Sequence, residues 1–461
     1  MDKTNASVER LGTEPIGKLL FKLAIPTVTA QIINMLYNIV DRIYIGHIPN
    51  IGTAALTGVG VCLPLIMIVS AFASLVSSGG APRSSIRLGE GKPDEAERIL
   101  GNSFTLQLII SAVLTVVILF FARPILLAFG ASNDTIGYAV RYMNIYAIGT
   151  VFVQLTLGMN AFISAQGFTK VSMFTVLVGA VTNIALDPLF IYGFKLDVSG
   201  AAIATLISQA ISSALALAFL LSNKSKIRLK PQYMPLKPRV ILPCVALGLS
   251  MFIMTASESL ISVCFNSSLQ KYGGDMAVGA MTILTSVMQF AMLPLQGIGQ
   301  GAQPIASYNY GAGNADRVKK TFRLLLIVNI IYSGVFWVLV MAFPRLFASI
   351  FTPDVALADY ASKVMRIYFG AMFVFGIQIA CQMLFISIGN ALCSITVAVV
   401  RKFVLILPLI YILPCIFENK VNAVFTAEPV SDFLAVCFTS VLFILMFTRS
   451  MKKLEAKKQN R

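Results

Sequence analysis

The sequence predicts an all-α integral membrane protein with twelve transmembrane helices in two six-helix lobes, related by a parallel pseudo-two-fold repeat. Three observations lead to this prediction: the composition, the number of apolar runs and an internal repeat. Of the 461 residues, 57% are hydrophobic and 12% are charged, against about half and about a quarter in soluble domains. So few charges could not cover the water-facing surface of a soluble protein of this size. Soluble enzymes and disordered chains are therefore excluded.

Twelve apolar runs follow one another along the chain, each near or above the roughly 20 residues that cross a bilayer as a helix. Backbone groups find no hydrogen-bonding partner in lipid, and these runs do not alternate as barrel strands do. Each run is therefore expected to be a helix. The predicted spans are 16–45, 54–79, 98–122, 137–166, 171–193, 199–222, 239–270, 276–301, 319–343, 359–388, 394–417 and 430–449.

The positive charges are distributed unevenly between the two sides of the predicted membrane. With a cytoplasmic N-terminus, 27 of the 36 Lys and Arg residues fall in cytoplasmic segments or span ends. Cytoplasmic loops carry such an excess, so both termini are predicted to be cytoplasmic in a multi-pass protein of the plasma (inner) membrane. The same rule accounts for the net charge of +16. A nucleic-acid partner is therefore not expected.

An internal repeat divides the chain at mid-length. The repeat has an offset of 222 residues: Gly79, Pro82, Ser85, Gly89, Gly91, Asp94, Tyr138, Met143, Ile145 and Tyr146 recur as Gly301, Pro304, Ser307, Gly311, Gly313, Asp316, Tyr360, Met365, Ile367 and Tyr368. The predicted domains are an N lobe (1–222), a basic cytoplasmic linker (223–238) and a C lobe (239–461). Six spans in each lobe leave both lobes in one orientation, with a cavity at their interface.

Charged side chains inside a span are costly, at about 2.5–3.5 kcal/mol on insertion scales. Seventeen of the 20 acidic residues fall in predicted loops or at span ends, and the three that do not are Asp41, Asp187 and Glu258. Membrane-embedded acids are functional candidates for this reason.

Asp41 and Asp187 are predicted to share one layer of the N lobe. At about 1.5 Å per residue they lie roughly 6–15 Å below the outer surface, together with Asn183 and Thr205. Tyr37 lies one turn before Asp41. Two carboxylates, an amide and a hydroxyl form an oxygen set that suits Na⁺ or a shared proton.

Glu258 lies in the C lobe and has Leu36 as its repeat equivalent, so this acid is not duplicated. It is expected to be a counter-charge for a cation or a second proton site, with Gln289 beside it. The single histidine and the lack of aspartate-rich motifs predict that the protein is not an enzyme.

Four segments resemble the multidrug and toxic compound extrusion (MATE) family, and the resemblance covers nearly the whole chain. They are LAIPTVTAQIINMLYNIVDRIYIG (23–46), FISAQGFTK (162–170), TNIALDP (182–188) and GIGQGAQPIASYNYGAGN (297–314). The resemblance implies twelve helices in two lobes and export of drugs or organic cations against entry of Na⁺ or H⁺. It implies no cofactor beyond that coupling ion.

The resemblance also implies roles for single residues. The family's N-lobe cation site matches Asp41, Asn183, Asp187, Thr205 and Tyr37, with Asn160 and Tyr142 similar to members of its hydrogen-bond network. Glu258 is similar to the seventh-helix acid of the NorM-type branch. Met372 stands where that branch has an aspartate, four residues after Tyr368. Coupling through the N-lobe acids is therefore expected.

The favoured function is a secondary active exporter that works by alternating access, expected to be a monomer in the lipid bilayer. The main alternative is a lipid-linked oligosaccharide flippase, which needs cationic side chains in the central cavity to hold a pyrophosphate. The predicted spans carry acids there, and Lys and Arg gather at the span ends. A membrane-embedded transferase and a channel are the remaining alternatives.

Overall fold

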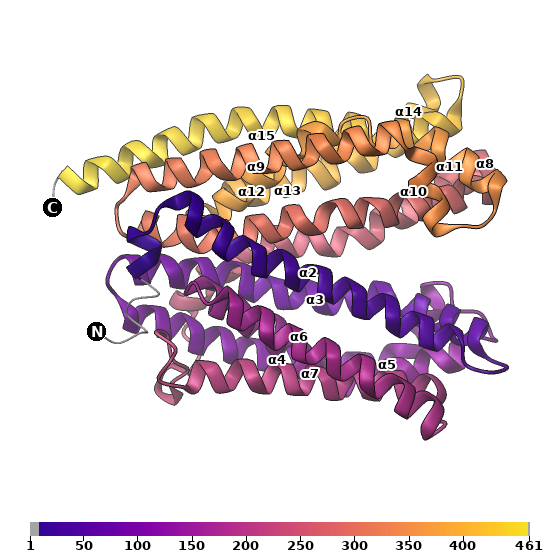
Figure 1. The fold of residues 1–461 in the computed structure, drawn as a ribbon, viewed down its shortest axis with the longest axis horizontal. Helices are drawn as coiled ribbons and strands as arrows, with labels where there is room; N and C mark the ends of the chain where they lie inside the picture. Colours follow the sequence, from indigo (N-terminus) through magenta and orange to yellow (C-terminus); the bar gives the residue numbers. More distant parts are fainter. Residues whose placement is uncertain (1–8, 460–461) are drawn as a thin grey trace.

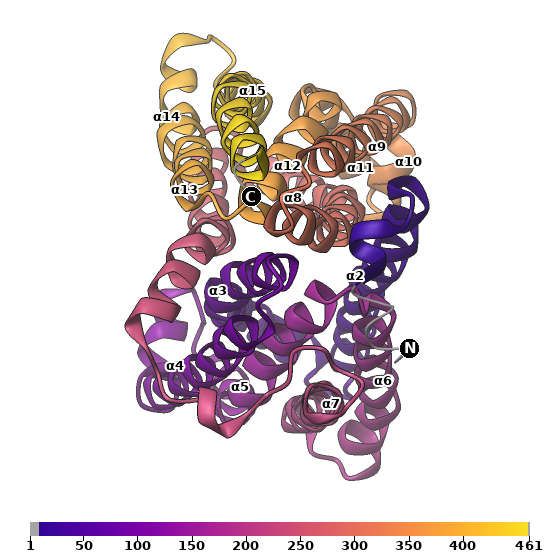
Figure 2. The same cartoon turned by 90° about the vertical axis from the view of Figure 1, so that its left-hand side faces the viewer.

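The computed structural model describes residues 9–459, and the regular elements of this part of the chain are helices that form two bundles side by side (Figures 1 and 2). The predicted all-α, two-lobe membrane fold is confirmed. Residues 1–8 and 460–461, which belong to the predicted cytoplasmic termini, lie outside the described residues. The start of α2 and the end of α15 lie at the same end of the molecule, on the left of Figure 1.

The N lobe consists of six spans. They are α2 (Ile16–Gly46), α3 (Gly52–Gly89), α4 (Pro93–Ala128), α5 (Ile136–Ala165), α6 (Thr169–Pro188), which continues into the π-helical η1 (Leu189–Gly193), and α7 (Asp197–Leu221).

The C lobe follows a short 3₁₀ turn, η2 (Pro231–Tyr233). Its helices are α8 (Pro238–Gly311), α9 (Ala315–Ala342), α10 (Pro344–Phe351), α11 (Val355–Tyr368), α12 (Met372–Ser387), α13 (Ala391–Val399), the π-helical η3 (Val400–Ile406), α14 (Leu407–Ile416) and α15 (Lys420–Gln459).

Twelve spans result once the breaks in these helices are taken into account. Ten helices of the described chain are long and apolar enough to cross a membrane, or eleven with α11 and α12, which meet at 55°, taken as one span. The 74-residue α8 makes two spans, because Gly274 has non-helical backbone angles (φ 63°, ψ −161°). Glycine tolerates this conformation at little steric cost.

The helix boundaries of the two lobes repeat with the offset of 222 residues. The helix α3 maps onto 274–311, the second part of α8, and α5 maps onto 358–387, which α11 and α12 cover. Even the turns correspond, since Gly91 and Gly313 both have φ of 75° where α3 and α8 end. The repeat read from the sequence therefore extends to backbone geometry.

The predicted loops that carry the repeated glycines are largely helical, which corrects the span ends at 79 and 301. The helices α3 and α8 continue to Gly89 and Gly311. Glycine, alanine and serine lower the hydropathy of these stretches without breaking the helix. These small residues lie where helices of the two lobes cross, because they allow the helix backbones to approach closely.

One of the close crossings between α3 and α8 is reciprocal. A methyl group added at Gly89 would overlap the backbone oxygen of Tyr308, and one added at Gly311 would overlap that of Ile86. Ile86 and Tyr308 are themselves repeat equivalents. The pseudo-two-fold axis therefore passes through this crossing, close to the cytoplasmic ends predicted for α3 and α8.

A larger side chain at Gly89 is expected to hold the two lobes apart at this crossing. The overlap would be with main-chain atoms of Tyr308, so a change of side-chain conformation cannot relieve it. Spin labels on α3 and α8 should show longer distances at the cytoplasmic end in Gly89→Leu. Gly60→Ala on the same helix is the control, since nothing lies within 4 Å of its added carbon. Equal distance changes in both variants would contradict this role of Gly89.

The basic linker is attached to the N lobe, beside α4 in Figure 2. The side-chain oxygen of Gln166 accepts hydrogen bonds from the backbone N–H groups of Lys226 and Ile227, at 2.8 and 2.9 Å. Asn102 on α4 accepts one from the N–H of Lys237 at 2.6 Å. Lys230 forms an ion pair with the buried Glu97, and this contact raises the pKa of Lys230 above its usual value. The linker thus remains positively charged and fixed to one lobe.

Candidate functional site

The N-lobe acids lie on two different helices and are both buried. Asp41 on α2 is 8% exposed, and Asp187 at the end of α6 is fully buried. They are near enough for the charge of one carboxylate to act on the other. The side-chain nitrogen of Asn183 lies 3.4 Å from both Asp187 Oδ1 and the hydroxyl of Thr205 on α7. The structure therefore brings together these four predicted residues from three helices.

Several oxygen atoms of this group have no hydrogen-bonding partner among the described residues. They are Asp41 Oδ1, Asp187 Oδ2 and Asn183 Oδ1, all inaccessible from outside. Buried polar atoms are nearly always paired, because an unpaired one costs about 1–3 kcal/mol. Unpaired oxygens on two carboxylates and an amide fit a proton or a hard cation such as Na⁺. The described chain contains no cluster of three or more His, Cys, Asp or Glu residues suited to a metal ion.

Tyrosines lie beside the two acids. Tyr37 is within electrostatic range of both Asp41 and Asp187. Tyr142 on α5 is 4% exposed, lies within range of Asp41 and stacks on Tyr146 at a ring distance of 6.4 Å. Both predicted tyrosines thus lie near Asp41, although no hydrogen bond of the described residues joins either of them to a carboxylate.

Asn160 contacts different groups. Its side chain donates to the backbone oxygen of Thr156 at 2.9 Å and accepts from the hydroxyl of Thr175 at 2.7 Å. The bond with Thr175 joins α5 to α6, and the bond to Thr156 lies within α5. Asn160 therefore contributes to the packing of the helices that carry the site, and the hydrogen bonds of the described residues do not link it to either acid.

In the C lobe, Glu258 has a partner other than the predicted Gln289. Its carboxylate forms an ion pair with Lys402 from η3, whose side chain is only 4% exposed. The predicted neighbour Gln289 is exposed, and no hydrogen bond in the described part of the chain joins it to Glu258. Met372, at the position of the missing aspartate, is buried in the C-lobe core.

A buried charge network surrounds this ion pair. Arg401 bonds to Asp432 through Nε at 3.0 Å and Nη2 at 2.9 Å, and Nη2 lies 3.5 Å from Glu428. The guanidinium also covers the ring of Phe375 at 4.5 Å, a cation–π arrangement. Two carboxylates and two cations are buried here, and the half-exposed carboxylate of Glu258 lies at their edge. For brevity, Glu258, Arg401, Lys402, Glu428 and Asp432 are called the C-lobe network.

Two sequence interpretations are corrected by the C-lobe network. The sequence predicts Glu428 and Asp432 in a loop or at a span end, but α15 begins at Lys420, so both lie within a span. Arg401 and Lys402 are among the 27 charges predicted to be cytoplasmic, although they lie inside the predicted eleventh span and are 7% and 3% exposed. A basic pair in the middle of an apolar run was the available signal, since such charges require buried partners.

Contacts between the lobes gather in the inner and middle parts of the helices. On α2, Thr27 donates to the backbone oxygen of Gly297 at 2.6 Å, and Gln31 bonds to Gln300 at 3.2 Å. Phe72 of α3 packs against Phe252 of α8 at 5.0 Å. These residues lie in the inner or middle parts of their helices. Side chains nearer the predicted outer ends are exposed, including Leu36, Ile43, Val263 and the carboxylate of Glu258.

The chain is similar in sequence to a known family and to known proteins. The model of the MatE family matches residues 26–189 and 250–412. The Multidrug export protein MepA of Staphylococcus haemolyticus is 23% identical over 423 residues, which cover 91% of this chain and 92% of that protein. MepA of Staphylococcus saprophyticus is 22% identical over 404 residues, covering 87% and 88% of the two chains.

Solved structures share the fold. The MATE multidrug transporter DinF-BH, solved in complex with a ligand, is 36% identical and has a TM-score of 0.87, with 96% of this chain and 98% of that chain covered. A crystal structure of a MATE protein in the bent conformation has a TM-score of 0.91 at 19% identity, with coverage of 97% and 99%.

Proposed function

Because this chain belongs to the MatE family of membrane transporters, we propose that it is a multidrug exporter driven by entry of H⁺ or Na⁺. The coupling ion binds at Asp41 and Asp187. The observation that carries this proposal is the set of buried, unpaired oxygens on these residues and Asn183. Both termini are cytoplasmic, and the transporter acts in the plasma membrane as a monomer.

Helix α2 is the element that links ion binding to the lobe interface. It carries Asp41 near its outer end and the Thr27–Gly297 contact in its inner half. Pro26 lies next to Thr27 inside the helix and removes one backbone hydrogen bond, so the helix can bend there. An ion drives transport only if it binds the two states of the protein with different affinities. Neutralising the Asp41 carboxylate changes the free-energy cost of burying it where α2 packs against α6 and α7. Ion binding thereby favours one of the two conformational states of the transporter.

The substrate occupies the space between the lobes. Inner contacts and exposed outer side chains support an outward-open arrangement of the two lobes, with the half-exposed Glu258 carboxylate at mid-span. An exposed carboxylate at this depth suits an organic cation, which is the kind of ligand that multidrug exporters carry. Lys402 already occupies one side of Glu258, so a C-lobe Na⁺ site is not favoured, and coupling rests on the N lobe.

The flippase alternative has less support. Its pyrophosphate would need accessible cations in the cavity, whereas Arg401 and Lys402 are buried and bound to carboxylates. The half-exposed carboxylate of Glu258 would repel the anionic substrate.

Transport of a fluorescent organic cation in proteoliposomes tests the proposal. Proton and sodium gradients are imposed separately, with vesicles lacking protein as the control. We expect uphill movement of the dye under one of the two gradients and only slow equilibration without either. Equal dye fluxes with and without each gradient would contradict ion-coupled export.

A further inference from the structure

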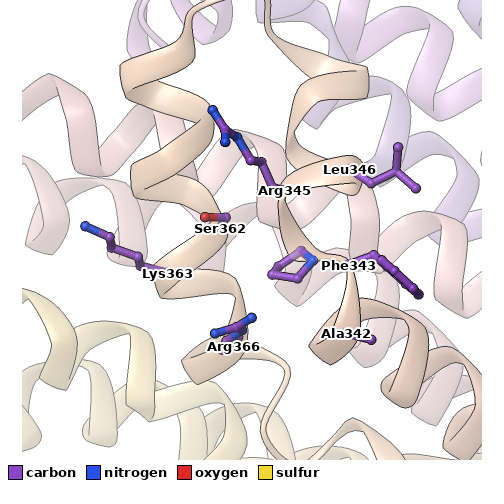
Figure 3. A pocket seen from close by; sticks show the side chains of 8 residues that line it. Ala342, Phe343, Arg345, Leu346, Ser362, Lys363 and Arg366 are labelled. Carbon is purple, nitrogen blue, oxygen red and sulfur yellow. The ribbon is translucent and has the colours of Figure 1, made fainter.

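A pocket lies at the outer end of the C lobe, away from the Asp41–Asp187 group and from the C-lobe network. The helix α9 ends at Ala342, the chain turns at Phe343, and α10 begins at Pro344. Between this turn and α11 is a cavity of about 300 Å³. It is lined by Ala342, Phe343, Pro344, Arg345, Leu346, Ser362, Lys363 and Arg366, and Figure 3 shows Arg345 on one helix with Ser362 and Arg366 on the other.

The pocket carries an excess of positive charge. Arg345 forms an exposed ion pair with Asp359 at 2.9 Å. Lys363 and Arg366 are three residues apart on α11 and so lie on one face. Neither has a carboxylate partner among the described residues. Two uncompensated cations beside a hollow favour an anion, and a phosphate can bond to both.

These cations stand on the side of the membrane where Lys and Arg are scarce. Only nine of the 36 are predicted to lie outside, and three of those line this pocket. The positive-inside rule therefore does not explain them. These charges at an exposed pocket need an explanation other than membrane topology.

Apolar side chains are exposed beside the cations. Phe343, Leu346, Ile350 and Val355 on and around α10 are between 57% and 67% exposed. A short amphipathic helix at the end of a span, with apolar residues outward and cations beside them, is typical of the boundary between headgroups and acyl chains. A ligand that fits both features has a phosphate and adjacent acyl chains.

The N lobe offers a comparison within the same molecule. Arg123, Arg141 and Asn144 are the repeat equivalents of Arg345, Lys363 and Arg366. In the N lobe, α4 continues unbroken to Ala128, whereas the equivalent stretch of the C lobe breaks at Phe343 to form the pocket. Arg366 and the helix break at Phe343 are therefore features of the C lobe that the N lobe does not repeat.

We propose that this pocket binds the phosphate headgroup of an anionic phospholipid from the outer leaflet. Arg366 and Lys363 hold the phosphate, and the exposed face around α10 lies against the acyl chains. The inference does not depend on the ion-coupled export proposed above.

The single tryptophan of the chain, Trp337, permits a direct test, since it lies on α9 a little more than one turn before the pocket. Full-length protein is reconstituted with phosphatidylglycerol or phosphatidylcholine carrying brominated acyl chains, and quenching of Trp337 gives the relative affinity. At roughly 1 kcal/mol for each basic residue near a membrane surface, one cation gives about a five-fold preference for the anionic lipid. We expect at least this preference in the unaltered protein.

The variants decide whether the pocket is responsible. Lys363→Gln/Arg366→Gln should lose the preference, and Lys363→Arg should keep it. Arg123→Gln/Arg141→Gln, at the repeat-equivalent positions, should also keep it. An equal preference in the double pocket variant would overturn the proposal, as would the absence of a preference in the unaltered protein. Loss of the preference when inorganic phosphate is added at millimolar concentration would assign the site to free phosphate and overturn the lipid assignment.

Discussion

Replacing Asp41 with asparagine is expected to abolish ion-driven export. Asparagine keeps the size of the side chain but can neither take up a proton nor attract a cation, so the ion no longer binds the two states differently. In proteoliposomes with an imposed gradient, the rate should fall at least about ten-fold, to the level measured without a gradient. The measurement is uptake of a fluorescent organic cation into these proteoliposomes.

Two further variants make this result specific. Asp134→Asn removes an exposed acid from an outer turn of the same lobe and should leave the rate unchanged. Glu258→Gln should weaken dye binding and keep the response to the gradient, because this half-exposed carboxylate is the proposed contact of the organic cation. The Asp41→Asn variant, in contrast, should bind the dye as tightly as the unaltered protein does. Gradient-driven uptake that survives in Asp41→Asn would remove Asp41 from the coupling mechanism.

Much of the fold could be predicted because hydrophobic runs and the distribution of Lys and Arg respond directly to the bilayer. The twelve spans and the offset of 222 residues are both found in the structure. Segments rich in small residues were the exception. The segment 79–85 appears polar when hydropathy is averaged over a window. In the structure it is helical and packs against the other lobe, and this contact exists only in the folded protein.

The two polar centres differ in how far the sequence could predict them. Asp41, Asn183, Asp187 and Thr205 could be grouped because their depth follows from helix rise and from position along predicted spans. The C-lobe network could not be grouped in that way. Its members come from three segments far apart in the chain, and the π-helical η3 lies between α13 and α14. Only the folded lobe shows that Arg401 lies beside Asp432.

Replacing Arg401 with methionine is expected to destabilise the protein by about 3–5 kcal/mol, the usual cost of removing one partner from a buried ion pair. The loss would leave Glu428 and Asp432, both at most 9% exposed, facing one another without the guanidinium. Contact with the ring of Phe375 would lose its cation–π component as well. The free energy of unfolding can be followed through Trp337 fluorescence in mixed micelles with increasing SDS.

A triple variant separates the lost charge from the lost packing. Arg401→Met/Glu428→Gln/Asp432→Asn leaves no unpaired charge at this place and should recover most of the stability, since buried ion pairs replaced as a unit often cost little. Lys319→Met is the control, because its ion pair with Glu455 is exposed at 46% on both sides and should be worth at most about 1 kcal/mol. If Arg401→Met costs no more than Lys319→Met, the C-lobe network does not hold the lobe together. If the triple variant is as unstable as the single one, the guanidinium stabilises the lobe through packing and not through its charge.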